Sequence, residues 1–337
     1  MKTKTAFITG ITGQDGAYLS KLLLENGYRV IGGARRSAER SFWRLKKLGI
    51  QDQVEIVDFD LMDYHNMVDV IKSYEFDEVY NLAAQSFVGT SFKQPFYSLK
   101  CNGLAVCELV DIIQQFSPGT KFYQASTSEM FGEVRETPQN EWTPFNPSSP
   151  YGIAKLMAHN FVEMYRDSYD FFGCCGILFN HESPLRGDEF VTKKINNYVR
   201  EYLRGTNDIE PLQLGNINAE RDWGFAGDYV KAMWSMMQLE KPNTYVIGTG
   251  EKHSVRNFVE IAFLHIDIPI IWEGKGVNEK GINANTKEVM VEINEKFYRP
   301  NDVETLLADP RKAYKALKWK PEVSFSKLVA KMVDEEV

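Results

Sequence analysis

Short apolar runs alternate with amphipathic segments along the first half of the chain. The apolar runs predict strands at residues 5–9, 29–33, 54–59, 78–83, 121–126 and 173–179. Apolar positions with the helical period predict helices at residues 17–26, 42–48, 65–73 and 99–115, and a further helix that starts near Pro150. Strands that alternate with helices in this way are typical of a parallel sheet covered on both faces. We therefore predict an α/β protein with a Rossmann-type doubly wound parallel sheet.

The second half of the chain has a less regular pattern. It predicts helices at residues 190–204, 226–238, 254–266 and 324–334, whereas the polar stretch at 274–287 is expected to be an exposed excursion. Trp223 and Trp319 are expected in the core. We expect residues 1–180 to form the Rossmann domain. Residues 181–337 should form mainly a smaller mixed α/β lobe, with some segments that return to the first domain.

Composition and charge narrow the classes of partner. The chain has 337 residues and a net charge of −7 without a basic stripe, which argues against nucleic acid or an anionic membrane as the main partner. It has no long uncharged apolar segment, and its N-terminus lacks the pattern of a signal peptide, so a cytoplasmic protein is expected. The four cysteines and five histidines show no metal-ligand spacing, so we expect no metal. Cys174 and Cys175 lie in an apolar run and are interpreted as buried thiols.

A glycine-rich turn follows the first predicted strand. Its three glycines have the spacing G-x-x-G-x-x-G and stand directly before a predicted helix. Glycines allow a sharp turn, and they let backbone amides approach a pyrophosphate at the positive end of the helix. The turn is therefore expected to bind a dinucleotide through Gly10, Thr12, Gly13, Gln14, Asp15 and Gly16.

The end of the second predicted strand bears on which dinucleotide is bound. An NAD-specific site usually has an acidic residue there, whereas this chain has Arg35, Arg36 and Ser37. Two guanidinium groups and a hydroxyl suit a 2′-phosphate, so NADP is the preferred cofactor. The alternative is that both arginines are ordinary solvated surface residues.

Two further strand ends are expected to contact the same cofactor. The third predicted strand leads to Asp60 and Leu61, which are placed to meet the adenine. The fourth leads to a segment expected to line the sugar and nicotinamide side, namely Leu82, Ala84, Gln85 and Ser86.

Tyr151 and Lys155 are the main candidates for catalysis. In a helix that starts near Pro150 they lie four apart, on one face. A neighbouring ammonium favours the phenolate and lowers the pKa of the phenol, so Tyr151 could act as a base nearer neutral pH. The Tyr-x-x-x-Lys spacing alone is weak evidence for catalysis, because many helices carry such pairs on solvated faces. The glycine turn upstream strengthens the interpretation.

The fifth predicted strand leads to Thr127, Ser128 and Glu129. A hydroxyl beside the tyrosine and lysine is sufficient for oxidation of an alcohol with a nicotinamide cofactor. A carboxylate adds a base that can remove the proton α to the new ketone. From chemistry alone, Glu129 could equally be an exposed loop carboxylate.

The chain resembles the GDP-mannose 4,6-dehydratases, a family of extended short-chain dehydrogenases/reductases. The resemblance covers nearly the whole chain and rests on ordered motifs at residues 8–16 (ITGITGQDG), 81–86 (NLAAQS), 122–129 (FYQASTSE), 149–155 (SPYGIAK), 176–184 (GILFNHESP), 221–224 (RDWG), 298–300 (YRP) and 319–321 (WKP). It implies conversion of GDP-mannose to GDP-4-keto-6-deoxymannose plus water, with NADP bound throughout.

The resemblance also implies roles for individual residues. Tyr151, assisted by Lys155, takes the proton of the C4 hydroxyl; Thr127 hydrogen-bonds the same oxygen, and Glu129 removes the C5 proton. His181 and Arg186 fall on cofactor positions, as do Tyr151 and Lys155. The residues expected to contact the GDP-sugar are Ser86, Ser128, Asn180, Lys194, Arg221, Arg256, Arg299 and Glu304.

Two segments depart from the family pattern. Relatives commonly have tyrosine and arginine where this chain has Asn146 and Ser148. Either the loop has drifted, or the sugar pocket is larger and accepts GDP-D-glycero-D-manno-heptose. The segment after Arg36 also differs, and in the family it reaches a neighbouring subunit; a homodimer or homotetramer is expected. Two other functions stay open: a nucleotide-sugar 4-epimerase or 4-reductase, which does not require Glu129, and a non-catalytic NADP-binding module.

Overall fold

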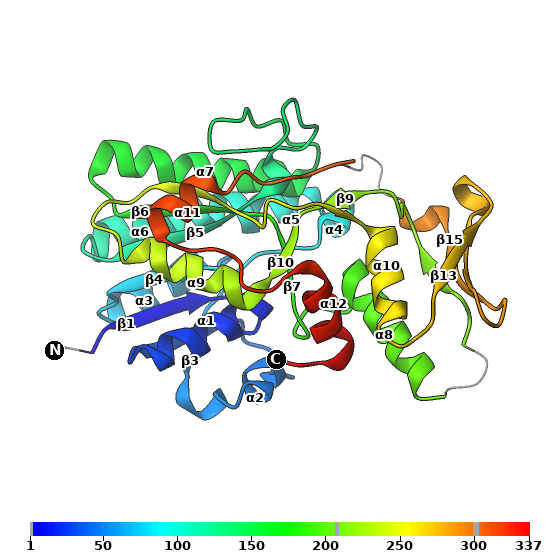
Figure 1. The fold of residues 1–337 in the computed structure, drawn as a ribbon. Helices are drawn as coiled ribbons and strands as arrows, with labels where there is room; N and C mark the ends of the chain where they lie inside the picture. The colour runs from blue at the N-terminus through cyan, green and yellow to red at the C-terminus, as the bar shows by residue number, and fades with distance from the viewer. Residues whose placement is uncertain (1–2, 206–208, 299–302) are drawn as a thin grey trace.

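A seven-stranded parallel sheet forms the centre of the fold (Figure 1). The computed structural model describes residues 3–205, 209–298 and 303–337. The strands follow the order β11, β6, β5, β4, β1, β2, β3, with bounds Thr244–Ile247, Gly173–Leu178, Lys121–Thr127, Glu78–Asn81, Thr5–Thr9, Arg29–Ala34 and Glu55–Asp58. All neighbouring strands in this sheet pair in parallel. The predicted Rossmann-type fold is confirmed.

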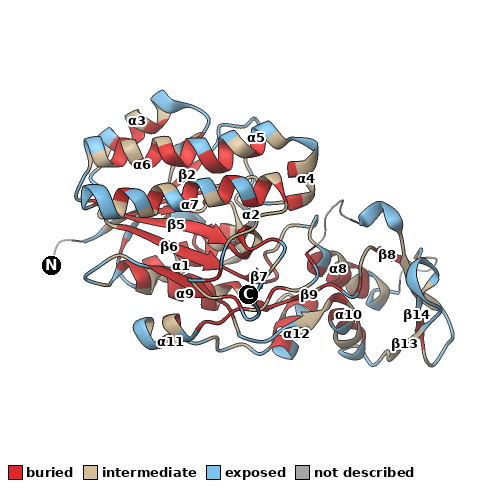
Figure 2. Ribbon diagram, turned by 90° about the horizontal axis from the view of Figure 1, so that it is seen from above, coloured by how far each residue is buried: buried red, intermediate tan, exposed pale blue. Residues whose placement is uncertain are grey.

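Helices cover both faces of the sheet (Figure 2). One layer contains α3 (Tyr64–Ser73), α6 (Ala105–Phe116) and α7 (Pro150–Tyr169), whose apolar side chains share a buried cluster with the sheet. The other contains α1 (Gln14–Glu25) and α9 (Ala226–Met237), which belong to a second cluster. The strand order reverses between β1 and β4, because the chain runs outward from β1 through β2 and β3 and then continues from β4 toward the other edge. Ligands of such sheets bind at the carboxyl ends of the strands beside this point.

Several predicted boundaries differ from the observed ones. Helix α1 begins at Gln14 and not at residue 17, because Gly13 is its N-cap and the glycine turn runs directly into the helix. The single helix predicted at 99–115 is divided into α5 (Pro95–Leu99), a π-helical turn (Lys100–Leu104) and α6. Short helices α2 (Trp43–Lys47) and α4 (Val88–Lys93) lie before β3 and α5.

The C-terminal lobe has its own buried cluster, formed mainly by α8 (Val191–Leu203), α10 (Val255–Leu264) and α12 (Phe325–Asp334). Beside them lies a four-stranded sheet in the order β13 (Ile270–Glu273), β14 (Lys280–Asn283), β15 (Val289–Ile293) and β8 (Leu212–Leu214). The prediction of an exposed excursion at 274–287 is therefore wrong for β14, where Ile282 and Asn283 are buried. The polar residues on either side of β14 form the turns that connect it to β13 and to β15.

Short strand pairs connect the lobe to the main sheet. β7 (Asn180–Glu182) pairs with β10 (Trp223–Phe225), and β9 (Glu220–Arg221) pairs with β12 (His253–Ser254). Two segments of the second half pack within the first: β11 is an edge strand of the main sheet, and α11 (Arg311–Leu317) contacts it. Trp223 and Trp319 are buried, as predicted. All four cysteines are free and buried.

Candidate active site

A cavity of about 840 Å³ opens at the carboxyl ends of β1, β4, β5 and β6, between the main sheet and the C-terminal lobe. It brings together most of the residues that the sequence predicted for a site. Those lining it are Gly10, Gly13, Gln14, Asp15, Gly16, Leu82, Ala84, Ser86, Thr127, Ser128, Glu129, Tyr151, Lys155, Asn180, His181, Arg186, Lys194 and Arg221.

Other predicted residues do not line the cavity. They are Thr12, Arg35, Arg36, Ser37, Asp60, Leu61, Gln85, Arg256 and Glu304. Arg299 lies outside the described residues. The first seven still lie in or beside the strand ends that a dinucleotide would follow, whereas Arg256 and Glu304 are in the lobe.

The glycine turn leaves no room for side chains. Gly10 has φ +71°, and a Cβ there would lie 2.8 Å from the backbone nitrogen of Ala83. A Cβ on Gly16 would lie 2.6 Å from the carbonyl oxygen of Gly10. The first turn of α1 is therefore packed tightly against the glycine turn. Residues 13–16, at the start of the helix, line the cavity, and the N-terminus of a helix is suited to a diphosphate.

Thr9 holds the turn against the end of β4. Its hydroxyl donates to Asn81 Oδ1 at 2.7 Å and accepts from the backbone amides of Leu82 and Ala83, each at 3.0 Å. Thr9 was not among the predicted site residues. Its position as the last residue of a strand before a glycine turn was the available signal.

Asp15 and His181 join the glycine turn to β7. Asp15 Oδ2 lies 2.8 Å from His181 Nε2, and His181 Nδ1 lies 2.8 Å from the carbonyl oxygen of Phe179. Burial alone would raise the pKa of Asp15, but the facing imidazole lowers it. Burial likewise opposes protonation of His181, yet Asp15 raises its pKa. The two groups therefore form an ion pair at the wall of the cavity.

Arg44 provides a second connection that the sequence did not predict. Its Nη1 donates to the carbonyl oxygen of Thr12 at 2.9 Å, and its Nε donates to that of Leu185 at 2.6 Å. One side chain of α2 thus ties the glycine turn to the loop that follows β7. The contact uses the backbone carbonyl of Thr12, a residue that does not line the cavity.

Tyr151 and Lys155 occupy the first turns of α7. Pro150 is at the start of the helix, and the Ser149 hydroxyl caps it by accepting from the Gly152 amide at 3.0 Å. Lys155 Nζ donates to the carbonyl oxygen of Ala125 at 2.9 Å and lies 5.9 Å from the centre of the Tyr151 ring. Both side chains are buried, and they share one helix face as predicted.

The electrostatics of the pair differ from the expectation of a lowered phenol pKa. Burial raises the pKa of Tyr151, a hydrogen bond with Thr127 lowers it, and the carboxylate of Glu129 raises it. Burial lowers the pKa of Lys155 to about 8. In the protein alone, burial therefore favours the neutral phenol. The positive charges of Lys155 and of a bound nicotinamide are expected to act against this effect of burial, because they favour the phenolate.

Thr127 and Glu129 lie at the end of β5, beside the start of α7. The Glu129 amide donates to Thr127 Oγ1 at 3.2 Å, which leaves the hydroxyl proton of Thr127 available to the phenol of Tyr151. Gly152 makes the approach of the two elements possible, because a Cβ there would lie 2.6 Å from the Glu129 carbonyl oxygen. Thr127, Glu129 and Tyr151 all line the cavity, and Thr127 and Glu129 both act on the phenol of Tyr151.

The predicted 2′-phosphate residues lie on the exposed end of β2. Arg35, Arg36 and Ser37 are exposed, and Arg35 Nη1 donates to the hydroxyl of Tyr97 at 3.2 Å. Tyr97 lies in α5, before residue 99 where the predicted helix starts, so its place beside Arg35 was missed. Asp60 follows β3, and its carboxylate accepts from the Met62 amide at 2.9 Å.

The lobe contributes a basic and aromatic wall. Lys194 Nζ donates to the Gln213 carbonyl oxygen at 2.6 Å and lies 3.8 Å from the centre of the Phe297 ring. Arg221 is buried and donates to the carbonyl oxygens of Glu220 and Glu304. Only the backbone of Glu304 is engaged in this contact.

Arg256 is placed differently from the expectation. Its guanidinium pairs with Glu279 at 2.9 Å and lies 4.5 Å from the centre of the Trp272 ring, away from the cavity. The ion pair and ring contact explain why a basic residue stands at this position of the lobe.

Asn146 and Ser148 are absent from the lining of the cavity. The Asn146 side chain donates to the carbonyl oxygen of Glu133 at 3.1 Å, and its own backbone carbonyl accepts from the Glu133 amide at 3.2 Å. Asn146 thus stabilises the loop before α7. The idea that small residues here enlarge the sugar pocket is not supported by their location.

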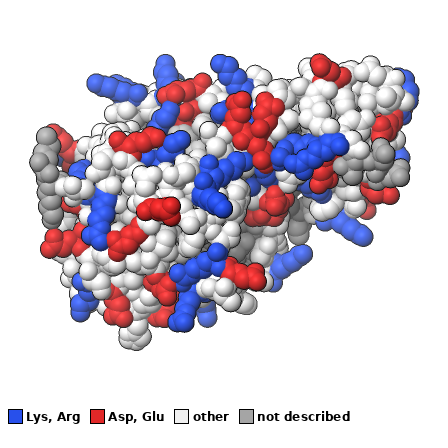
Figure 3. All heavy atoms as spheres, turned by 90° about the horizontal axis from the view of Figure 1, so that it is seen from below, with Lys and Arg blue, Asp and Glu red and all other residues white. Residues whose placement is uncertain are grey.

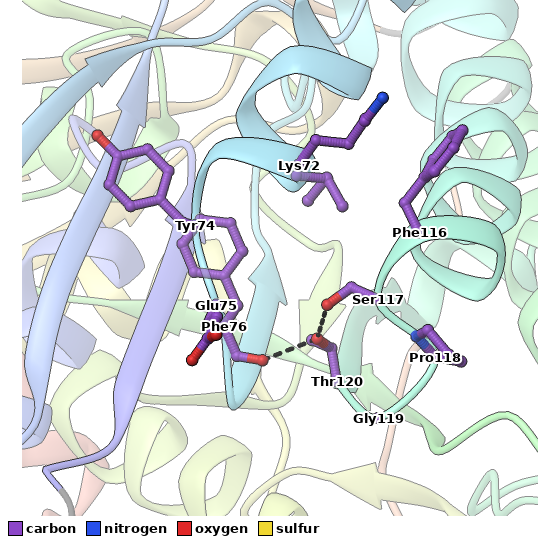
Figure 4. Close-up of a pocket in the computed structure, with 10 residues that line it drawn as sticks. Lys72, Tyr74, Glu75, Phe76, Phe116, Ser117, Pro118, Gly119 and Thr120 are labelled. Atoms are coloured by element: carbon purple, nitrogen blue, oxygen red, sulfur yellow. Dashed lines mark hydrogen bonds between the residues drawn. The ribbon is translucent and has the colours of Figure 1, made fainter.

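A second hollow lies at the opposite edge of the sheet, before β4 and β5 (Figure 4). Its polar groups already bond to one another: Ser117 and Thr120 lie 2.8 Å apart, and Thr120 donates to the Phe76 carbonyl oxygen at 2.7 Å. It has no arrangement of groups for catalysis.

The described residues contain no group of three or more His, Cys, Asp or Glu side chains that could hold a metal ion. Among the same residues, no helix is both long and apolar enough to cross a membrane. On the face drawn in Figure 3, basic and acidic side chains are interspersed.

Comparisons with known proteins agree with the geometry. Among solved structures, a UDP-glucose 4-epimerase from Thermotoga maritima has a TM-score of 0.81 at 23% identity and covers 98% of this chain and 97% of its own. A dTDP-glucose 4,6-dehydratase from Streptomyces venezuelae also has a TM-score of 0.81, at 19% identity, with 98% and 96% covered. At these identities the likeness shows the fold alone.

Sequence relatives are much closer. The GDP-mannose 4,6 dehydratase of Homo sapiens is 47% identical over 98% of this chain and 91% of its own length. That of Dictyostelium discoideum is 46% identical over 99% of this chain and 96% of its own. A family model described as GDP-mannose 4,6 dehydratase matches residues 7–332. With the catalytic residues of the resemblance gathered in one cavity, the chain belongs to the GDP-mannose 4,6-dehydratase family.

Proposed function

We propose that this protein is a GDP-mannose 4,6-dehydratase, a hydro-lyase that uses bound NADP and releases GDP-4-keto-6-deoxymannose and water. The observation that carries the proposal is that Thr127, Glu129, Tyr151 and Lys155 all line the same cavity. A 4-epimerase or 4-reductase needs no carboxylate at position 129, and a non-catalytic module needs none of the four.

Four protein groups supply the acid–base chemistry. When bound, NADP supplies the hydride acceptor for C4 and the hydride donor for C6. Tyr151 takes the proton of the C4 hydroxyl, and the Thr127 hydroxyl holds the same oxygen. Lys155 stabilises the phenolate, which burial otherwise disfavours. These groups produce the C4 ketone that acidifies the hydrogen on C5.

Glu129 then carries out the elimination. Its carboxylate removes the C5 proton and donates it to the C6 hydroxyl, which leaves as water. C5 regains one proton as C6 is reduced, and this proton is matched by the one that Tyr151 took from the C4 hydroxyl. Every bond broken is thus matched, and no second substrate is consumed.

The cofactor is proposed to be NADP and not NAD. The glycine turn provides the cradle for a diphosphate, and Arg35 and Arg36 provide two cations where NAD enzymes usually have a carboxylate. Replacing both arginines by alanine should weaken NADP binding by about tenfold or more and leave NAD binding unchanged. Arg40→Ala is the matched control in the same loop, since Arg40 pairs with Asp58. Equal losses for both cofactors would contradict the assignment.

The nucleotide is proposed to lie toward the lobe, with residues 1–180 as the cofactor domain and 181–337 as mainly the substrate lobe. Lys194 and Arg221 line the cavity there and can face a diphosphate. Burial lowers the pKa of Lys194, and an anionic ligand would oppose that shift.

We also propose a homo-oligomer. Leu104, Ile153, Met157 and Met164 are exposed along the π-helical turn and the outer face of α7. Apolar side chains at such helical spacing are typical of a covered face, and a second copy could supply the same surface. Met157→Glu should shift the protein toward monomers in sedimentation velocity, with Glu25→Lys as a control at the exposed end of α1, on the opposite face of the sheet. An unchanged distribution would exclude this face.

The decisive experiment follows a label. GDP-mannose with deuterium at C4 should give a product with deuterium at C6 in the same molecule, without added cofactor. Accumulation of NADPH in step with product would identify a plain dehydrogenase instead, and tight NADP binding without turnover would favour the module.

A further inference from the structure

His159 lies two turns after Tyr151 on α7, with Lys155 between them. The three residues are spaced four apart, so their side chains share one helix face. His159 Nδ1 lies 2.8 Å from the Oγ of Ser126, and the two residues are only 1% and 2% exposed. Ser126 directly precedes Thr127 on β5. A buried polar contact therefore joins α7 to the strand that ends in the catalytic hydroxyl.

The other nitrogen of the ring faces a carboxylate. His159 Nε2 lies 3.6 Å from Glu163, and Glu163 also accepts from Arg166 at 3.1 Å and from the Thr244 hydroxyl at 2.5 Å. Thr244 begins β11. An Nε2 proton suits the facing carboxylate, and it leaves Nδ1 as the acceptor for the Ser126 hydroxyl.

The surroundings keep the ring neutral and fixed. Burial lowers the pKa of His159 to about 4, Glu163 acts in the opposite direction, and Arg166 adds to the lowering. The ring of Phe145 packs edge-on against the imidazole, with 5.3 Å between their centres. The imidazole can therefore serve as a neutral bridge with one donor and one acceptor. His159 is not among the residues that line the cavity, whereas its partner Ser126 is.

We propose that His159 is a positioning residue: its contact with Ser126 sets the placement of the end of β5 relative to α7. This inference rests on the proposed dehydratase function. The proton transfers assigned to Tyr151 and Glu129 join groups carried by these two elements. A misplacement of about 1 Å can cost roughly a hundredfold in rate. The binding groups of the lobe are untouched by such a shift, so kcat and not KM should change.

The test uses two variants that remove the contact and one that restores it. Ser126→Ala deletes only the hydroxyl, and His159→Leu deletes the acceptor while filling the space. Each should lower kcat for GDP-mannose by about tenfold or more, with KM and NADP affinity within about twofold of the wild type. His159→Asn should recover most of kcat, because its Oδ1 branches from Cγ as Nδ1 does and can accept from Ser126.

Val162→Ala is the matched control. Val162 is fully buried on the same helix and makes no polar contact, so this variant should lose thermal stability but keep kcat. Wild-type kcat in both Ser126→Ala and His159→Leu, or equal losses in His159→Asn and His159→Leu, would overturn the role of His159 alone. A wild-type protein that fails to dehydrate GDP-mannose would overturn the proposed function as well.

Discussion

Asp15 and His181, which are 166 residues apart in sequence, form an ion pair with 2.8 Å between Oδ2 and Nε2. The pair ties the first turn of α1 to β7 and thus fixes the angle between the glycine turn and the strand that leads into the lobe. Its strength depends on pH, since each partner shifts the pKa of the other.

The sign of this dependence follows from the two shifts. The folded-state pKa of His181 is raised, so its contribution to stability is complete below the unfolded value of about 6.5 and is lost as pH rises through the folded value. The pKa of Asp15 is lowered, so its contribution is lost only in acid. The melting temperature of the cofactor-free wild type should exceed that of His181→Gln most near pH 6, and the difference should shrink toward pH 8. A constant difference would show that the pair carries no charge.

Glu129→Gln separates the dehydratase from its alternatives. The amide keeps the size of the side chain but cannot remove the C5 proton, so elimination should fall by roughly a hundredfold or more. Tyr151 and Lys155 are intact, so oxidation at C4 should persist and be visible as transient absorbance of reduced cofactor. A 4-epimerase would be almost unaffected by the same change.

Lys155 should give the enzyme a descending pH limb. Burial lowers the pKa of the ammonium to about 8, and the phenolate loses its support as that proton is lost. kcat/KM should therefore fall as pH rises through about 8. Lys155→Arg retains its charge, so its residual activity should lack this limb. The same limb in both proteins would assign it to another group.

Gly152→Ala tests the close approach of α7 to β5. The new Cβ would lie 2.6 Å from the Glu129 carbonyl oxygen, and the backbone must move to admit it. We expect a loss of about 1–3 kcal/mol in the free energy of unfolding and a lower kcat. Gly119→Ala is the matched control, because a Cβ there meets no atom within 4 Å. A fully active Gly152→Ala variant would mean that the separation of these elements is not critical.

The sugar can be assigned by comparing kcat/KM for GDP-mannose and GDP-D-glycero-D-manno-heptose on one preparation. We expect GDP-mannose to be preferred, since Asn146 supports a loop and does not border the cavity. Exchanging Asn146 and Ser148 for tyrosine and arginine should leave the ratio of the two values within about threefold. A preference for the heptose that this exchange abolishes would restore a role for the two positions in specificity.

The first half of the fold could be predicted because its signals are local. Runs such as 173–178 are buried on both faces of the sheet, and their ends place Thr127 and Asn180 at one edge. The helix cap at Ser149 and Pro150 likewise fixes the register of Tyr151 and Lys155. Here the hydrophobic pattern and the turn chemistry specify the same structure.

The remainder depended on contacts that sequence spacing does not reveal. β14 is polar and short, and it is held as a strand by pairing with both β13 and β15. In sequence, Arg256 resembles a residue that binds phosphate, yet its guanidinium forms an ion pair with Glu279 and packs on the ring of Trp272. The link from Arg44 to Thr12 and Leu185 joins segments that no local pattern connects.

The position of β11 at the edge of the main sheet governs how the chain can assemble during synthesis. β6 cannot pair with β11 until residue 247 has left the ribosome. Likewise, α1 cannot pack against α9 until α9 has been synthesised. The nascent first half would therefore lack the apolar side chains that α9 adds to the buried cluster containing Leu19 and Leu23. If synthesis stalls between residues 180 and 226, the nascent chain would expose apolar surface and be prone to aggregation. For the same reason, the two halves of this sequence are unsuited to separate expression or to exchange between relatives at that boundary.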